Sequence, residues 1–227
     1  YGENPHQEAK FFASTVKEPF SLATAEQLNG KELSYNNIQD ANATLNIARE
    51  FDDPFCVGVK HMNPCGSATG KTIAEAWKKA YEADKTSIFG GIVAANREID
   101  LETAQMLKPI FLEIVMAPSF APDALELLCT KKNLRVLKVD MTKDNVVRKQ
   151  YVSMNGGMLV QDRDINTKPV AADQCVTEAK PTAEQLADLE FAWKIVKHVK
   201  SNAIVVAKNG MTYGVGAGQM NRIGSAE

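Results

Sequence analysis

Two spacings of apolar residues alternate along the chain between residues 38 and 139. Short, largely apolar runs are typical of buried strands, and they lie at 55–60, 92–95, 114–116 and 134–139. Before and between these runs, apolar residues recur every three or four positions, which predicts helices. The helical segments contain Ile38, Ala41, Leu45 and Ala48; Ile73, Ala76, Trp77 and Ala80; residues 100–106; and Ala124, Leu127 and Leu128. Alternating strands and helices predict a layered α/β fold.

Polar residues mark where three helices should begin. Thr72 with Glu75, and Thr182 with Gln185, have the spacing of a capping box. Asp100 stands directly before an apolar-periodic segment and is placed to cap its helix.

The chain changes character after residue 140. Residues 141–179 are polar and weakly periodic, with a predicted strand pair around Gly156-Gly157. A second α/β unit is predicted from Pro181, with one helical face formed by Leu186, Leu189, Trp193 and Val196. Residues 203–207 and 211–215, joined by Asn209-Gly210, predict a β-hairpin with a type I′ turn. The predicted organisation is therefore a first unit at 1–145, a connecting segment at 146–180 and a second unit beginning at 181–227.

The composition is that of a globular protein. Of 227 residues, 44% are hydrophobic and 24% are charged, and the net charge of -2 argues against a general nucleic-acid binder. Four cysteines without CxxC spacing favour reduced thiols and a cytoplasmic location. The polar start lacks a signal peptide, and no apolar run is long enough for a membrane span. Because the sequence also lacks an initiator Met, we expect a piece of a longer protein.

Three segments resemble known motifs, but each lacks a residue or a spacing that its motif requires. Residues 66–72 resemble a P-loop with one residue too few between the glycines, and a loop leading into a helix is the expected structure. Residues 214–219 resemble a dinucleotide fingerprint without its last glycine, which favours a simple backbone turn. Pro64-Cys65 resembles part of the zinc-deaminase motif, but neither its second Cys nor its Glu is present. We therefore predict no zinc site.

Lys60 ends the strand predicted at 55–60, and His61 directly follows it. In an α/β sheet, ligands bind beyond the carboxyl ends of strands. There an imidazole can accept a proton near neutral pH, and an ammonium can stabilise a developing oxyanion. A solvated Lys and a structural His fit the spacing equally well, so position alone does not decide between the two interpretations.

Two further segments bear on this choice. Ser87-Ile88-Phe89-Gly90-Gly91 predicts a glycine turn before the next strand, where a flat ring or a phosphate can approach the backbone. Ser201-Asn202 precedes the predicted hairpin, where an amide can bind a ligand carboxamide or cap a helix end. Each segment taken by itself favours the structural interpretation.

Together these segments resemble a known family. Five segments occur in the same order in AICAR transformylase, the formyltransferase part of bifunctional purine-biosynthesis proteins that also have inosine monophosphate cyclohydrolase activity. They are residues 1–7, 60–66, 87–91, 201–205 and 214–222. The resemblance covers the whole chain, and the segments at 60–66 and 219–222 are its most specific parts.

The resemblance implies two tandem, zinc-free cytidine-deaminase-like units, the second one truncated here. It implies formyl transfer from 10-formyltetrahydrofolate to the 5-amino group of AICAR, by a homodimer whose active sites lie between subunits. No metal is required, and a monovalent cation near the Ser201 turn is left open. A non-catalytic, deaminase-like nucleotide-binding fragment is the main alternative, and a P-loop kinase is a weaker one.

The resemblance also assigns roles to individual residues. His61 is the proton acceptor, Lys60 the transition-state stabiliser and Asn202 a further catalytic residue. The implied AICAR contacts are Tyr1, Gly2, Phe89, Gly90, Glu113, Asn202 and Arg222, and Ile223 lies beside the folate. The family has Asp where this chain has Glu113, and it has an Arg before the position of Tyr1.

Overall fold

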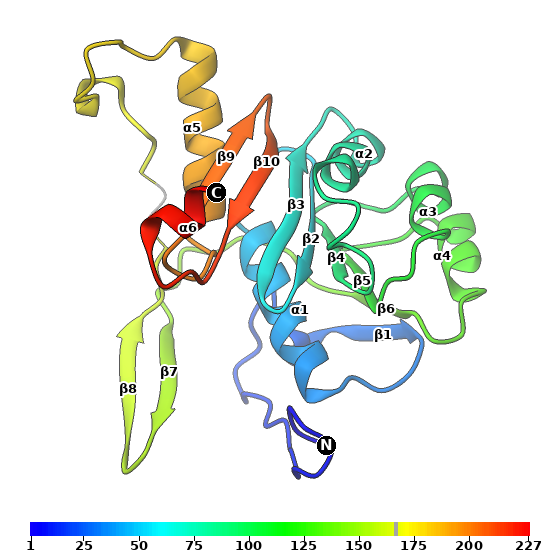
Figure 1. Ribbon diagram of the computed structural model, residues 1–227. Helices are drawn as coiled ribbons and strands as arrows, with labels where there is room; N and C mark the ends of the chain where they lie inside the picture. Colours follow the sequence, from blue (N-terminus) through cyan, green and yellow to red (C-terminus); the bar gives the residue numbers. More distant parts are fainter. Residues whose placement is uncertain (166–167) are drawn as a thin grey trace.

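The structure, a computed structural model, describes residues 1–165 and 168–227 (Figure 1). Its helices are α1 (Tyr35–Ala48), α2 (Ile73–Ala83), α3 (Leu101–Leu107), α4 (Pro122–Cys129), α5 (Ala183–Val196) and α6 (Arg222–Ala226), with short 3-10 turns at Leu22–Thr24 and Ala172–Gln174. Its strands are β1 (Glu26–Asn29), β2 (Phe55–Lys60), β3 (Asn63–Thr69), β4 (Ile92–Ala95), β5 (Ile114–Ala117), β6 (Arg135–Lys138), β7 (Lys149–Met154), β8 (Gly157–Asp162), β9 (Ile204–Lys208) and β10 (Met211–Gly216). The predicted α/β class is confirmed.

One mixed sheet organises the molecule. Its strand order is β1-β6-β5-β4-β2-β3-β10-β9. β4, β5 and β6 run parallel to one another, whereas β2 is antiparallel to both β4 and β3. Helices α2, α3 and α4 cover one face of the sheet, and α1 and α5 cover the other (Figure 1).

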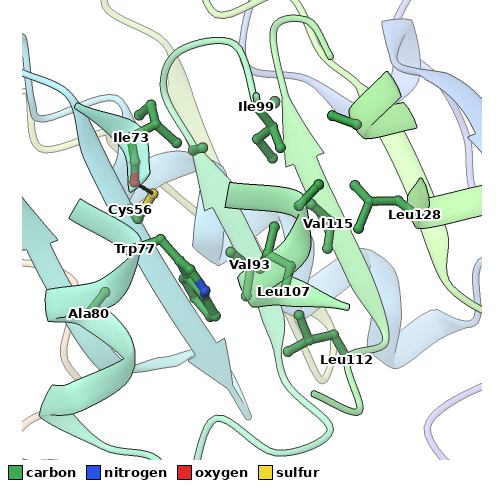
Figure 2. Packing of buried hydrophobic residues seen from close by; sticks show 14 of the residues in the cluster. Cys56, Ile73, Trp77, Ala80, Val93, Ile99, Leu107, Leu112, Val115 and Leu128 are labelled. Carbon is green, nitrogen blue, oxygen red and sulfur yellow. Dashed lines mark hydrogen bonds between the residues drawn. The ribbon is translucent and has the colours of Figure 1, made fainter. Parts of the chain in front are cut away.

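The central strands are buried on both faces. In β4, Val93 and Ala95 belong to the core beneath α2, α3 and α4, whereas Ile92 and Ala94 belong to the core against α1. Figure 2 shows Trp77 and Val93 within the first of these cores. Because side chains alternate between the faces of a sheet, a strand covered on both faces shows no polar alternation. This explains the unbroken apolar runs from which the central strands were predicted.

The expected loop at residues 66–71 is wrong over residues 66–69, which belong to β3. The β2–β3 register shifts between Gly58 and Val59, and such a bulge accommodates Pro64. Gly66 packs closely on α2, since a Cβ there would lie 2.0 Å from the carbonyl oxygen of Ala80. Small residues are needed for this close packing, and they conceal the strand from pattern analysis.

The predicted helix caps at Thr72, Asp100 and Thr182 are confirmed. Each side chain accepts a hydrogen bond from the backbone N–H three residues further on. The box at Thr182 is complete, but the one at Thr72 is only half formed, because the Glu75 carboxylate accepts from the N–H of Lys71 instead.

The predicted β9–β10 hairpin adds to the same sheet as the first unit. Asn209 and Gly210 have φ values of 54° and 62°, which confirms the type I′ turn. β10 pairs with β3, where the Thr212 hydroxyl accepts a hydrogen bond from the N–H of Ser67 at 3.0 Å. The division at 145 and 180 stays a prediction, and residues 166–167 of the connecting segment lie outside the described residues.

Helix α5 packs through a different face from the predicted one. Leu189 and Trp193 are 48% and 56% exposed, whereas Phe191 and Ile195 are buried. Phe191 lies against an aromatic pair, with its ring centroid 5.3 Å from that of Phe51. Both stripes have helical spacing, so periodicity alone did not show which one reaches the sheet.

The strand pair predicted around Gly156-Gly157 is confirmed as β7 and β8, which form a separate two-stranded sheet. We call residues 149–162 the β7–β8 arm. It projects from the rest of the molecule (Figure 1), and every residue of both strands is exposed.

Candidate active site

Lys60 and His61 lie where β2 turns into β3. Lys60 ends β2 and pairs with Asn63, which begins β3, so His61 and Met62 form a two-residue turn. Their φ values are 52° and 62°. A tight hairpin turn requires such left-handed residues and normally uses Asn and Gly, which is why the sequence did not predict a turn here. The side chain of His61 is exposed to solvent.

The ammonium group of Lys60 is held at the glycine turn that precedes β4. Its Nζ donates a hydrogen bond to the carbonyl oxygen of Phe89 at 2.8 Å. The next residue, Gly90, has a φ of 73°, and its N–H donates to the carbonyl oxygen of Phe111 at 2.7 Å. A Cβ on Gly90 would lie 3.9 Å from Nζ of Lys60. The predicted turn at 87–91 is thus confirmed, and its Phe89 carbonyl oxygen holds the ammonium group of Lys60 in place.

An open cavity of about 910 Å³ adjoins the His61–Met62 turn. Five of the predicted site residues line it: Tyr1, Lys60, His61, Gly90 and Glu113. Four further cations also contribute to the lining: Lys31, Lys131, Lys132 and Arg135. The volume lies within the range of small-molecule sites, and the cations favour an anionic ligand.

The cavity lies at a different edge of the sheet from the one expected. Lys60 does end a strand, but β2 is antiparallel to β4. The carboxyl end of β2 therefore meets the amino ends of β4, β5 and β6, which begin just after Gly91, Glu113 and Leu134. The usual rule of ligand binding at the carboxyl ends of parallel strands does not describe this site.

Glu113 presents a fixed carboxylate to the cavity. Its Oε2 accepts a hydrogen bond from Nη1 of Arg135 at 2.7 Å and a longer one from Nδ2 of Asn37 at 3.4 Å. Arg135 also donates to the backbone carbonyl of Glu32. The ion pair is half-buried, so Glu113 is oriented before any ligand arrives, as suits an acceptor for ligand hydroxyl groups.

Asp40 of α1 lies beneath the His61–Met62 turn and also lines the cavity. Its Oδ1 accepts a hydrogen bond from the N–H of Met62 at 2.9 Å. Burial raises the pKa of this carboxyl group, and the hydrogen bond and the positive charge of His61 oppose the rise only partly. No salt bridge in the described part of the chain involves Asp40.

The raised pKa of Asp40 predicts the sign of a stability change. The folded chain binds this proton more readily than the unfolded chain, so the ionised carboxylate destabilises the fold at neutral pH. Asp40→Asn should therefore raise the melting temperature by a few degrees at pH 7. This gain should shrink as the pH falls through the raised pKa and vanish below the unfolded value near 3.8. Thermal unfolding between pH 3 and pH 8 measures it, and a gain that grows on acidification would contradict the assignment.

Five other predicted site residues do not line the cavity. Gly2 is buried beside it, and Phe89 contributes its carbonyl to Lys60. Arg222 and Ile223 begin α6 and are exposed. Asn202 is bonded within its own region, since its N–H and its Nδ2 both donate to the carbonyl oxygen of Gln219 at 3.0 Å.

The side chain of Asn63 connects the loop that carries Asn202 to the His61–Met62 turn. Nδ2 of Asn63 donates to the carbonyl oxygen of His61 at 3.0 Å, while its Oδ1 accepts from the N–H of Lys200 at 3.2 Å. The loop that carries Asn202 is therefore held against the turn, although the side chain of Asn202 does not reach the cavity.

No three side chains of His, Cys, Asp and Glu converge to hold a metal ion anywhere in residues 1–165 and 168–227. None of the helices described has the length and apolar character needed to cross a membrane.

Comparison with known proteins places these features in a family. The sequence pattern of the AICARFT/IMPCHase bienzyme matches residues 1–227. The chain belongs to the AICARFT/IMPCHase bienzyme family. The resemblance inferred from the five motif segments is thereby confirmed.

Curated relatives of this bienzyme family match the whole chain. The bifunctional purine biosynthesis protein PurH of Anoxybacillus flavithermus is 62% identical over 227 residues, and those of Bacillus subtilis and Oceanobacillus iheyensis are 58% and 56% identical. The match covers 100% of this chain and 44% of each relative. The chain therefore spans less than half the length of these relatives.

Three residues that shape the cavity were not predicted from the sequence: Asn37, Asp40 and Arg135. Asn37 gave a usable signal, because it falls on the apolar stripe of α1 that continues through Ala41 and Leu45. A polar residue at a core position is the informative exception to apolar burial. Asp40 and Arg135 gave no such signal, since charged residues at the end of a strand or on a helix usually face solvent.

Proposed function

We propose that this chain carries the formyltransferase activity of the bienzyme family, which moves a formyl group from 10-formyltetrahydrofolate to the 5-amino group of AICAR. The observation that carries the proposal is the position of Lys60 and His61, side by side on a turn at a cavity lined by Tyr1, Gly90 and Glu113. The motif residues that are far apart in sequence thus share one cation-rich cavity of suitable size.

The proposed chemistry uses a base and an oxyanion donor. The AICAR amine is a weak nucleophile because its lone pair is delocalised towards the ring carboxamide. His61 accepts the N–H proton, directly or through that carboxamide, while the nitrogen attacks the formyl carbon. A general base of this kind contributes about 10²–10⁴-fold in rate.

Lys60 acts on the formyl group in the same step. The formyl oxygen becomes negative in the tetrahedral intermediate, and the ammonium stabilises it, on the scale of roughly 2.7–4 kcal/mol for one oxyanion donor. The bond between the formyl carbon and N10 of the folate then breaks, and the folate nitrogen leaves with a proton. The alignment of two substrates supplies much of the remaining acceleration.

A formyl-transfer assay on the complete protein, with AICAR and 10-formyltetrahydrofolate, tests the proposal directly. Formylated nucleotide should form without an added divalent metal ion. Tight AICAR binding with no product at any folate concentration would favour the alternative, a non-catalytic nucleotide-binding fragment.

We further propose a cytoplasmic homodimer with active sites between subunits. In this arrangement, Lys60 and His61 of one copy act beside the Asn202 and Arg222 region of another. Two features support it: Arg222 and Ile223 are exposed outside the cavity, and the β7–β8 arm is exposed on both faces.

The finer fold assignment also belongs to this proposal. Residues 1–145 would form one zinc-free, cytidine-deaminase-like unit, and residues 181–227 would begin a second. The edge position of β9 supports this division, because the outer backbone N–H and C=O groups of an edge strand can pair with a further strand.

Arg222→Ala should weaken AICAR binding by about 10- to 100-fold, the scale of one charge-assisted hydrogen bond. Arg222 has no ion pair among the residues described, so its guanidinium is free to bind an anionic or carbonyl-rich nucleotide. Titration calorimetry on the complete protein measures the affinity, with Lys208→Ala as the control for removing an exposed cation. Equal weakening of AICAR and folate, together with a lower melting temperature, would instead indicate a structural role for Arg222.

A further inference from the structure

The His61–Met62 turn is held in a conformation that its own residues disfavour. Both residues have left-handed φ values, which are uncommon for any residue other than Gly. Such a conformation persists only where the surrounding structure enforces it, and residues of this kind cluster at functional sites.

One side chain from another element bonds to the backbone of these two residues. Oδ1 of Asp40, on α1, accepts the N–H of Met62 at 2.9 Å. Asn63, the neighbour in sequence, holds the carbonyl oxygen of His61 from the other side. Asp40 is therefore the long-range contact that sets the turn relative to the helix and the cavity.

Asp40 also places at the turn a carboxylate without a salt-bridge partner among the described residues. Two charged groups act on its pKa: His61 of the turn lowers it, and Glu113, just before β5, raises it. The Asp40 carboxylate in turn helps to raise the pKa of the Cys65 thiol of β3, which Lys60 of β2 lowers. Among the described residues it forms no salt bridge, and its burial opposes ionisation. A neutral Asn would accept the same hydrogen bond without this penalty, so the stability of the fold does not account for a carboxylate here.

We propose that Asp40 is a positioning residue for formyl transfer: its hydrogen bond holds the His61–Met62 turn, and its charge stabilises the imidazolium of His61. This inference rests on the proposed function. When the N–H bond of the AICAR amine breaks, the bonding electrons stay on nitrogen and the proton passes to the imidazole. The imidazole thereby gains a positive charge, which the nearby carboxylate favours.

Two substitutions separate the hydrogen bond from the charge. Asp40→Asn keeps an oxygen that accepts the Met62 N–H but removes the charge, whereas Asp40→Ala removes both. In the complete protein, we expect kcat to fall about 10-fold in the first variant and about 100-fold or more in the second, within the range that a general base contributes. KM for AICAR and for the folate should change little, because neither substrate is bound through Asp40.

The matched control is Asp123→Asn. Asp123, at the start of α4, also accepts a backbone N–H, that of Ala124 at 2.8 Å, but it does not line the cavity. Its replacement should leave kcat unchanged.

Stability and turnover should move in opposite directions in Asp40→Asn, which a merely structural residue would not produce. Wild-type kcat in Asp40→Asn would overturn the role of the charge, and equal kcat in the Asn and Ala variants would overturn the role of the hydrogen bond. Loss of kcat in step with melting temperature would reduce Asp40 to a structural residue. If the wild-type protein forms no product, it is the proposed function that fails, and this outcome is distinct from the other three.

Discussion

Replacing His61 with Ala in the complete protein should lower the turnover of formyl transfer by about 100- to 10,000-fold, the range expected for loss of a general base. The affinity for AICAR should change little, because the cavity is formed mainly by other residues, among them Tyr1, Gly90 and Glu113. Steady-state kinetics and calorimetry together separate the two effects. Turnover close to that of the wild type would remove His61 from the mechanism.

Lys60→Leu should lower turnover by about 100- to 1,000-fold, the effect of losing one oxyanion donor. The reason is that the ammonium acts mainly when the formyl oxygen becomes negative, so ground-state binding should weaken much less. The control is Lys71→Leu, which removes an exposed cation at the start of α2. If Lys60→Leu raised KM alone, Lys60 would be a binding residue.

The sequence predicted the apolar central strands and the β9–β10 hairpin well, but it missed β3, which lies inside the sheet. The strands at 55–60, 92–95 and 114–116 were found because burial on both faces leaves them almost wholly apolar. β3 was missed because its Pro and Gly serve a bulge and a close contact with α2. The predicted packing face of α5 was wrong because two stripes had helical spacing, and it is the stripe with Phe191 and Ile195 that packs into the core beside Phe51.

In the candidate site, too, some residues could be predicted from the sequence and others could not. Motif residues could be named from the sequence, and the structure brings Tyr1, Lys60, His61, Gly90 and Glu113 to one cavity. The residues that orient them could not be named. Asp40 bonds to Met62 and Arg135 to Glu113, and each pair is 22 residues apart in sequence, too far for a local pattern to reveal. Charged residues such as these also usually face solvent.

The β7–β8 arm exposes apolar side chains to solvent on both of its faces. Cross-strand pairing puts Tyr151 beside Val160 on one face and Val152 beside Leu159 on the other. Their exposed fractions lie between 40% and 62%. A lone two-stranded sheet is only marginally stable in water, and apolar surface of this kind marks an association site. Because the proposed active site needs a second copy of the chain, that copy is the partner that we assign to the arm.

Changing both Val152 and Leu159 to Lys should therefore dissociate the proposed dimer and, with it, abolish most formyl transfer. The two ammonium groups would face each other across the strands and would be buried against the partner. Loss of two interface anchors, at about 2 kcal/mol each, raises the dimer dissociation constant by about 1,000-fold. Analytical ultracentrifugation of the complete protein over a range of concentrations measures the shift. The control, Gln150→Lys with Gln161→Lys, adds the same charges to an exposed polar pair on the same face and should leave the dimer largely intact. A wild-type protein that sediments as a monomer and yet transfers formyl groups, or a Val152/Leu159 variant that remains fully dimeric, would show that the arm does not hold two copies together.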